Sequence, residues 1–362
     1  MYNKILFVHF PHVNNGGLPI IDERNRIALM TLTSNLVNIS LHPFSCSSTN
    51  CWVRIFSKFK MLCGKPLQNS SILYDELETG NVMLFFSHSS YGLLIKEIRR
   101  KYPALRVVSF FHNVESEYYK KNLGVCFNLG DCFRYILYKK IEANTVRYAD
   151  KLIVLNNRDR ILLSRIYGVE HSFVFPTTIK DRFNLSSKKS LNENYPLVLL
   201  FVGTLFPSNE QGVMWLAEKI SPYVNVQINI VGMHMEQLAP QLKGYKNIKV
   251  VGEVDPETLD MYYYEADVFI STLFIGGGMK TKIAEAMMFA LPIIATEESF
   301  QGYNLDYSKI GLKSDIPQEI IMFINSLNKN RKLLKEYSKN SRLQYLKYYS
   351  YECSCDYLNK IL

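Results

Sequence analysis

The feature of the sequence that most constrains the fold is a repeated alternation of short apolar runs with segments of helical pattern. Apolar runs of strand length occupy residues 4–10, 82–88 and 150–156 in the first half, and 197–203 and 267–273 in the second. The segments between them carry the three-to-four-residue apolar spacing of helices. Because a continuous apolar strand between helices is typical of a parallel sheet covered on both faces, we expect an α/β fold.

A polar segment, Ser186–Pro196, interrupts this alternation near the middle of the chain. Its sequence, "SSKKSLNENYP", has the Ser, Asn and Lys content of a linker, and the α/β pattern starts again after it. A chain of 362 residues is also too long for one ordinary core. We therefore predict two Rossmann-like, doubly wound domains facing a cleft, over residues 1–185 and 186–345. A C-terminal helix over 346–362 is expected to pack back on the first domain.

The apolar content gives no sign of a membrane span or of a secretion signal. No run of 18 apolar residues occurs, and the apolar run in residues 1–12 is too short for a signal peptide. The seven cysteines are odd in number and contain no C-x-x-C pair, so we expect reduced thiols and neither a disulfide framework nor a zinc site. These features favour a cytoplasmic protein.

The formal net charge of +9 favours an anionic partner. Basic residues alternate with aromatic ones in Cys51–Leu62 and Cys132–Glu142, and both stretches have the pattern of amphipathic helices. Such helices either lie on an anionic membrane surface or simply expose a solvated basic face. The chain has no RNA-binding aromatic motif, no zinc finger and no run of five like charges, so nucleic acid is not an expected partner.

The segment "GGGMKTKIAEAM" (Gly276–Met287) follows the apolar run 267–273. A glycine-rich turn between a strand and a helix presents free backbone N–H groups, and Lys280 and Lys282 add positive charge. The spacing is neither that of a P-loop nor that of a dinucleotide-binding fingerprint. Taken alone, the segment is either a phosphate site or an ordinary turn with solvated lysines.

Several segments in order resemble the retaining glycosyltransferases of the GT-B fold, in the large group called glycosyltransferase family 4. They include "LLFVGTLFPSNEQGVMWLAEKISPYV", "NIKVVGEVDPETLDMYYYEADVFIST" and "GGGMKTKIAEAMMFALPIIATEESFQG" in the second half, and "HNVE" and "ADKLIVLNNRDRILLSRIYG" in the first. The resemblance covers nearly all of the chain and is strongest over residues 199–302. It implies an acceptor-binding first domain and a second domain that binds a nucleotide sugar.

The resemblance gives the second domain its candidate residues. Glu285 aligns with the second glutamate of the family's E-x7-E motif, which contacts the ribose of the donor. The first glutamate falls at Gly277, so this chain lacks it, and backbone N–H groups of the turn are left to contact the donor sugar. The loop after the first strand also lacks the family's arginine and lysine, which leaves Lys280 and Lys282 to neutralise the diphosphate. The donor-binding candidates are Gly203, Thr204, Gly252, Glu253, Val254, Gly277, Gly278, Met279, Lys280, Thr281, Lys282 and Glu285.

The first domain contributes a smaller set. Gly16 and Gly17 resemble the family's glycine loop beneath the diphosphate, although a flexible turn explains each glycine equally well. His112 follows an apolar run at a strand end, where the family places a residue that contacts the donor sugar. Glu115 either orients this loop or binds the acceptor. His112, Lys280 and Glu285 are the candidate catalytic residues.

The implied reaction transfers a sugar from a nucleoside diphosphate sugar to a hydroxyl of a glycan or lipid-linked acceptor, with retention of configuration. No D-x-D motif occurs, so we expect metal-independent chemistry with no cofactor besides the donor itself. A role in surface polysaccharide synthesis at the inner face of the membrane fits the basic first domain. The alternatives are a sugar-nucleotide epimerase of the same fold and a catalytically silent sugar-nucleotide-binding protein.

Overall fold

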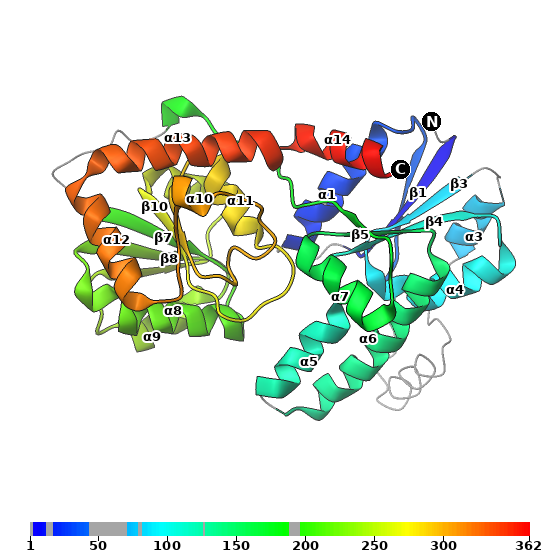
Figure 1. Ribbon diagram of the computed structural model, residues 1–362, viewed down its shortest axis with the longest axis horizontal. Coiled ribbons are helices and arrows are strands. Elements are labelled where there is room, and N and C mark those ends of the chain that lie inside the picture. Colours follow the sequence, from blue (N-terminus) through cyan, green and yellow to red (C-terminus); the bar gives the residue numbers. More distant parts are fainter. Residues whose placement is uncertain (1–2, 12–16, 43–70, 79–81, 126, 188–195) are drawn as a thin grey trace. The chain divides into compact units, whose positions relative to one another are not determined.

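The computed structural model describes residues 3–11, 17–42, 71–78, 82–125, 127–187 and 196–362, and Figure 1 shows the elements that they form. The chain divides into two compact units. Unit 1 comprises Met1–Pro176 and Ser354–Leu362, and unit 2 comprises Thr177–Cys353. The sequence places these divisions at residues 185 and 345. The basic stretch Cys51–Leu62 and Gly16 lie outside the described residues.

Unit 1 is built on a six-stranded parallel sheet in the order β2-β1-β3-β4-β5-β6. Its strands are β1 (Lys4–His9), β2 (Leu36–Ser40), β3 (Val82–Phe86), β4 (Arg106–Phe111), β5 (Lys151–Val154) and β6 (Phe173–Val174). Its helices are α1 (Gly17–Met30), α3 (Ser71–Leu77), α4 (Gly92–Lys101), α5 (Glu115–Val125), α6 (Leu129–Tyr148), α7 (Asn157–Tyr167) and the end of α14 (Tyr351–Ile361). Every residue of β3 is buried, as expected for a central strand covered on both faces.

Unit 2 repeats this architecture with the strand order β12-β11-β10-β7-β8-β9, again parallel throughout. Its strands are β7 (Leu197–Val202), β8 (Val226–Val231), β9 (Ile248–Gly252), β10 (Val268–Ser271), β11 (Ile293–Ala295) and β12 (Gly311–Lys313). Its helices are α8 (Pro207–Lys219), α9 (Ala239–Leu242), α10 (Pro256–Glu265), α11 (Thr281–Met288), α12 (Pro317–Lys329) and α13 (Arg331–Tyr348). The predicted fold of two doubly wound parallel-sheet domains is confirmed.

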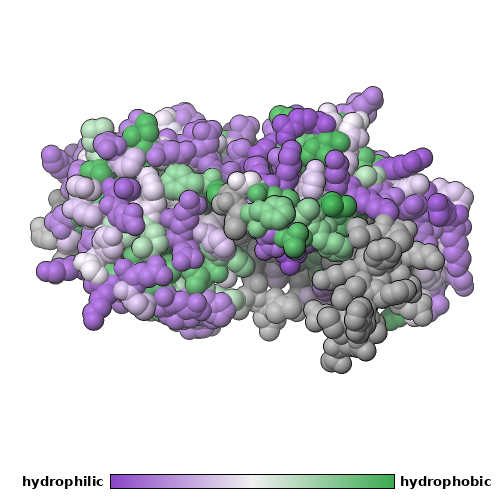
Figure 2. Space-filling view, turned by 90° about the horizontal axis from the view of Figure 1, so that it is seen from below, coloured by the Kyte–Doolittle hydropathy of each residue, from purple (hydrophilic) through white to green (hydrophobic). Residues whose placement is uncertain are grey.

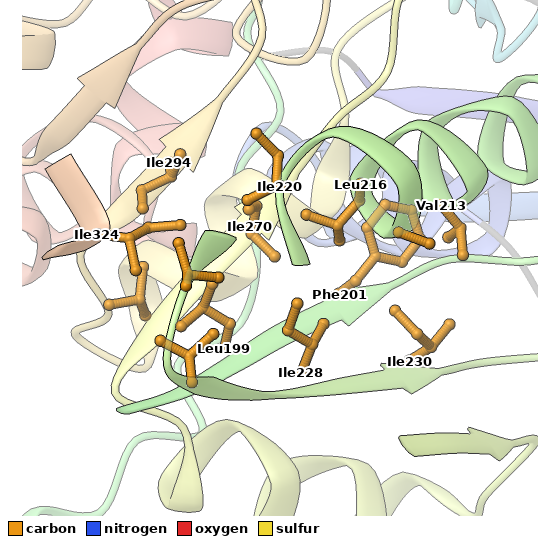
Figure 3. Close-up of a cluster of buried hydrophobic side chains, with 14 of the residues drawn as sticks. Leu199, Phe201, Val213, Leu216, Ile220, Ile228, Ile230, Ile270, Ile294 and Ile324 are labelled. Atoms are coloured by element: carbon orange, nitrogen blue, oxygen red, sulfur yellow. The ribbon is translucent and has the colours of Figure 1, made fainter. Parts of the chain in front are cut away.

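Helix α8 covers one face of this second sheet through a row of apolar side chains. Figure 3 shows Val213 and Leu216 of the helix beside Phe201 of β7, and Ile220, the C-cap residue, beside Ile270 of β10; these side chains are at most 1% exposed. Burying each such side chain stabilises the unit by about 1.5–3 kcal/mol. The contact is close because α8 carries Gly212, at which a Cβ would lie only 2.3 Å from the carbonyl oxygen of Thr272. This packing fixes α8 against the carboxyl end of β10.

The sequence did not predict the helices α3 and α5 of unit 1. The sequence indicates a polar loop after β4, but α5 begins there, at Glu115. The carboxylate of Glu142, on α6, accepts hydrogen bonds from the backbone N–H groups of Glu115 (2.7 Å) and Ser116 (3.2 Å). These are amides that a helix leaves unsatisfied in its first turn. A side chain from a distant helix therefore caps α5, and a local pattern does not show such a cap.

The chain returns to unit 1 at its C-terminus. Lys151 of β5 donates a hydrogen bond to the backbone carbonyl of Ile361, and the ring of Tyr357 lies 6.2 Å from that of Phe175. The preceding helix α13 belongs to unit 2, where the hydroxyl of Tyr345 donates to the carbonyl of Ile179 at 2.9 Å. Among the described helices, none is both long and apolar enough to cross a membrane.

Candidate functional site

The glycine turn connects the carboxyl end of β10 to the start of α11. Gly278 adopts a φ of +58°, a left-handed conformation that glycine reaches without a steric penalty. Lys280 is the N-cap residue of α11, so the N–H groups of the first helical turn follow immediately after it. The sequence alone leaves this turn ambiguous, and its position at the carboxyl edge of a parallel sheet is where such folds bind ligands.

Glu285 lies on α11 and is almost completely buried, with 2% of its surface exposed. Its two carboxylate oxygens accept hydrogen bonds from Lys282 Nζ at 2.8 and 3.0 Å, and the hydroxyl of Tyr263 donates to Oε2 at 3.0 Å. Burial, followed by the charge of Glu285, raises the pKa of Tyr263 well above its ordinary value, so the phenol keeps its proton and donates. The arrangement holds the carboxylate in one orientation on α11.

The other lysine of this segment, Lys280, is also paired with a carboxylate. Lys280 Nζ lies 2.9 Å from Glu298 Oε1 and 3.2 Å from the carbonyl oxygen of Gly277. The hydroxyl of Tyr303 donates to the carbonyl of Lys280 at 2.8 Å and fixes the backbone where α11 begins. The structure therefore gives each lysine its own carboxylate, Glu285 for Lys282 and Glu298 for Lys280, rather than two solvated cations.

Other donor-binding candidates lie at the ends of neighbouring strands. Gly203 and Thr204 follow β7, which is the neighbour of β10 in the sheet. Asn209 donates to the carbonyl of Thr204 at 2.6 Å, and its amide occupies the space where a Cβ of Gly203 would lie. The carboxyl ends of β7 and β10 thus bring these two residues and the glycine turn to the same edge.

The segment Gly252–Val254 lies further along this edge, after β9. Gly252 has a φ of +83° and sits against the side chain of Glu236. Glu253 is exposed, and Asp255 next to it is the N-cap of α10, where its carboxylate accepts from the backbone N–H of Thr258 at 2.9 Å. In the sheet order, β8 separates this segment from β7.

In unit 1, His112 directly follows β4 and joins a buried polar cluster. Its ring stacks on that of His88 at 5.4 Å, and its Nε2 lies 3.7 Å from Oδ1 of Asp22 on α1. Ser87 donates a hydrogen bond to the same Asp22 oxygen. Burial, and then the charge of His112, lowers the pKa of His88 well below its ordinary value, which keeps that ring neutral. Asp22 and His88 carry no local motif, so sequence patterns did not point to them.

Glu115 begins α5 beside this cluster, and its Oε1 lies 3.7 Å from Nε2 of His88. Burial, with a smaller contribution from the charge of Glu142, raises the pKa of Glu115 to about 7. Burial also raises the pKa of Glu142 to about 7, against hydrogen bonds from Ser116 and Tyr167 that favour its charged form. Gly17, the remaining candidate of this unit among the described residues, is the first residue of α1.

Among the described residues, no group of three or more His, Cys, Asp and Glu side chains is placed to hold a metal ion. Cys353 and Cys355 are free thiols on α14.

The donor candidates Met279 and Thr281 flank Lys280, with Met279 buried and Thr281 the first residue of α11. The candidate site of unit 2 is therefore an edge of backbone N–H groups, two lysines and two carboxylates.

Two doubly wound parallel-sheet domains in succession are the architecture of the GT-B glycosyltransferases. Residues 196–305 match the family model described as Glycosyl transferases group 1, which spans the glycine turn and Glu285. The family model matches this part of unit 2, and the fold of the chain is that of the GT-B glycosyltransferases.

Two curated relatives share part of this sequence. An uncharacterized 44.6 kDa protein in the cps region of Klebsiella pneumoniae is 26% identical over 158 residues, which is 40% of this chain and 40% of the relative. The chain thus matches well under half the length of that protein. An uncharacterized glycosyltransferase of Methanocaldococcus jannaschii is 24% identical over 286 residues, covering 71% of this chain and 67% of the relative.

Solved structures share the fold over the whole chain. The sucrose-phosphate synthase of Thermosynechococcus elongatus has a TM-score of 0.72 at 14% identity, covering 99% of this chain and 98% of that one. Anabaena HepE, solved in complex with UDP and glucose, has a TM-score of 0.67 at 13% identity, covering 99% of both chains. At these identities the likeness concerns the fold.

Proposed function

We propose that the protein transfers a sugar, with retention, from a nucleoside diphosphate sugar to a hydroxyl of a glycan or lipid-linked acceptor. The observation that carries this proposal is the buried carboxylate of Glu285, fixed by Lys282 and Tyr263 beside the glycine turn of unit 2. A fixed carboxylate accepts hydrogen bonds from two neighbouring hydroxyls, which is what a ribose presents. The UDP and glucose held by HepE support this class of donor.

The departing diphosphate is the group that unit 2 has to stabilise. The bond between the anomeric carbon and the phosphate oxygen breaks, and a bond to the acceptor oxygen forms on the same face of the sugar. The acceptor proton passes to the leaving phosphate, so the scheme requires neither a protein base nor a metal ion. Lys280 and the N–H groups at the start of α11 supply positive potential where negative charge develops.

We assign the acceptor to unit 1, with His112 contacting the reacting sugar and Glu115 the acceptor. We expect the product to be a surface polysaccharide. Two chemical features of unit 1 fit an acceptor at a membrane. Arg134, Lys139 and Lys140 are exposed on α6, and apolar side chains are exposed near the start of the same helix: Phe127 (73%), Leu129 (78%) and Ile136 (53%).

These features suit the inner face of a membrane, because apolar side chains enter the lipid boundary while lysine and arginine meet anionic headgroups. Figure 2 shows the side toward which the ends of α5 and α6 point in Figure 1, with hydrophobic residues gathered among hydrophilic ones. Liposome flotation with and without anionic lipid tests this. We expect binding that the triple change of Arg134, Lys139 and Lys140 to Glu reduces, and equal recovery of both proteins would refute it.

The reaction is tested by incubating the protein with a panel of UDP and GDP sugars, with and without lipid-linked acceptors, and following nucleotide release and product. Transfer to the acceptor supports the proposal, an epimerised sugar nucleotide indicates an epimerase, and binding without turnover indicates a silent binding protein. Glu285→Gln should reduce donor use at least about tenfold, the effect of losing one hydrogen bond to a charged group. Glu218→Gln, an exposed carboxylate on α8, is the matched control.

A further inference from the structure

The glycine turn of unit 2 meets a carboxylate that comes from a different element. Glu298 follows β11, and 17% of its side chain is exposed. Its Oε1 lies 2.9 Å from Lys280 Nζ, and a Cβ placed on Gly276 would lie 3.1 Å from this same oxygen. The carboxylate therefore lies directly against the stretch of turn that has no side chains of its own.

The segment that carries Glu298 is fixed at the end of β10. The hydroxyl of Ser299 donates to the carbonyl of Ser271 at 3.0 Å and accepts from the backbone N–H of Leu273 at 3.1 Å. The Thr296 hydroxyl lies 2.8 Å from that of Ser299 and donates to the carbonyl of Leu273. The residues on either side of Glu298 are thus tied to the start of the turn. Such support holds a side chain in a defined position before a ligand arrives.

The adjacent Glu297 has a different environment. Its side chain is 73% exposed and lies 3.6 Å from Lys313 on β12. Two consecutive glutamates therefore differ in what they contact, one facing solvent and the other facing the glycine turn. This difference makes Glu297 an internal control for Glu298, because the two positions share the same chemistry and nearly the same place in the chain.

We propose that Glu298 is the side chain that recognises the hydroxyls of the donor sugar, and that Lys280 exchanges it for the donor diphosphate on binding. This inference rests on the proposed function. The diphosphate is an anion that competes with Glu298 for Lys280, and a carboxylate released from its lysine has two oxygens to accept hydrogen bonds from adjacent sugar hydroxyls. Gly276 has no side chain, and Lys280 and Glu298 occupy the space beside it, so a ligand at this part of the turn meets both groups directly. The carboxylate that contacts the donor sugar is then Glu298, from the segment after β11, and not a residue of the glycine turn.

The competing explanation is that Glu298 only neutralises Lys280. The two explanations predict different effects of removing Glu298 on two affinities, that for the nucleoside diphosphate and that for the sugar nucleotide. If Glu298 binds the sugar, its removal weakens the sugar nucleotide but not the nucleoside diphosphate. If it only neutralises Lys280, its removal changes the affinity for both ligands by the same factor, because both present the diphosphate to that lysine.

The test is calorimetric titration of the wild-type protein, Glu298→Gln and Glu297→Gln with UDP, UDP-glucose, UDP-N-acetylglucosamine, GDP and GDP-mannose. For the sugar nucleotide that the wild type binds best, we take the ratio of its affinity to that of its parent nucleotide. We expect Glu298→Gln to reduce this ratio about tenfold or more, and Glu297→Gln to leave it unchanged. Affinity for the parent nucleotide should stay the same or rise in Glu298→Gln, since Lys280 loses a competing anion.

A second variant keeps the test decisive if Glu298→Gln is unstable. Glu298→Asp keeps a negative charge beside Lys280 but shortens the side chain by one methylene, so the ratio should still fall if Glu298 binds the sugar and stay at its wild-type value if Glu298 only neutralises Lys280. An unchanged ratio in Glu298→Gln, or an equal loss for both ligands, overturns the role of Glu298 while the proposed function stands. Failure of the wild-type protein to bind any of the five ligands overturns the proposed function as well.

Discussion

Replacing Tyr263 by phenylalanine isolates one hydrogen bond of the Glu285 site. The side chain is fully buried, its hydroxyl donates to Glu285 at 3.0 Å, and its ring stacks on Phe289 at 4.7 Å with an interplanar angle of 8°. Phenylalanine keeps the ring and removes only the oxygen. A hydrogen bond to a charged group contributes about 1.5–3 kcal/mol, so we expect the free energy of unfolding to fall by about that amount.

The remaining partner of Glu285 does not compensate for this loss. Lys282 has 32% of its side chain exposed, so solvent weakens its attraction for the carboxylate. We also expect nucleotide affinity to fall, because Glu285 loses one of the two groups that orient it. Tyr262→Phe, at the neighbouring and partly exposed position on α10, is the matched control and should change the unfolding free energy by less than about 0.5 kcal/mol.

The measurement is urea unfolding followed by circular dichroism for the wild type, Tyr263→Phe, Glu285→Gln and the double variant. The double-mutant cycle should give a coupling energy of about 1 kcal/mol or more between the two side chains. If the two single effects add to within about 0.5 kcal/mol, the hydroxyl does not stabilise the carboxylate and the account of this site is wrong.

Two further predictions concern unit 1 and the packing of α8. Burial raises the pKa of Glu115 to about 7, whereas the same carboxyl in the unfolded chain has a pKa near 4.5. Between these two pH values the folded state therefore holds a proton that the unfolded chain has released. The contribution of Glu115 to the free energy of unfolding is consequently lost as the pH rises from about 4.5 to 7. As the pH rises across that range, Glu115→Gln should therefore become more stable relative to the wild type in thermal or urea unfolding. A difference in unfolding free energy that stays constant with pH would contradict a buried, protonated Glu115. Gly212→Ala brings a Cβ to 2.3 Å from the Thr272 carbonyl oxygen and should destabilise the fold by about 1–3 kcal/mol, whereas Gly244→Ala meets no atom within 4 Å. Equal melting temperatures for these two alanine variants would show that α8 shifts without cost.

Local patterns were enough to predict the α/β architecture. Apolar runs such as β3 and β7 are buried along nearly their whole length, which is why their continuous hydrophobicity identified them. The short edge strand β2 and the helices α3 and α5 were not recognised. Most residues of β2 are at least partly exposed, which leaves a weak apolar signal, and α5 is capped by Glu142 from another helix.

The candidate site, too, was predicted only in part from the sequence. The sequence by itself determined the two parallel sheets, the glycine turn and the alignment of Glu285, because these depend on residue type and order within short segments. Tertiary structure alone decided which groups surround them: Tyr263 comes from α10 and Glu298 from the segment after β11. The physical reason is that parallel strands collect their carboxyl ends at one edge of the sheet, so residues far apart in the chain become neighbours there. Pairing of Lys280 with Glu298 and of Lys282 with Glu285 is a consequence of that convergence.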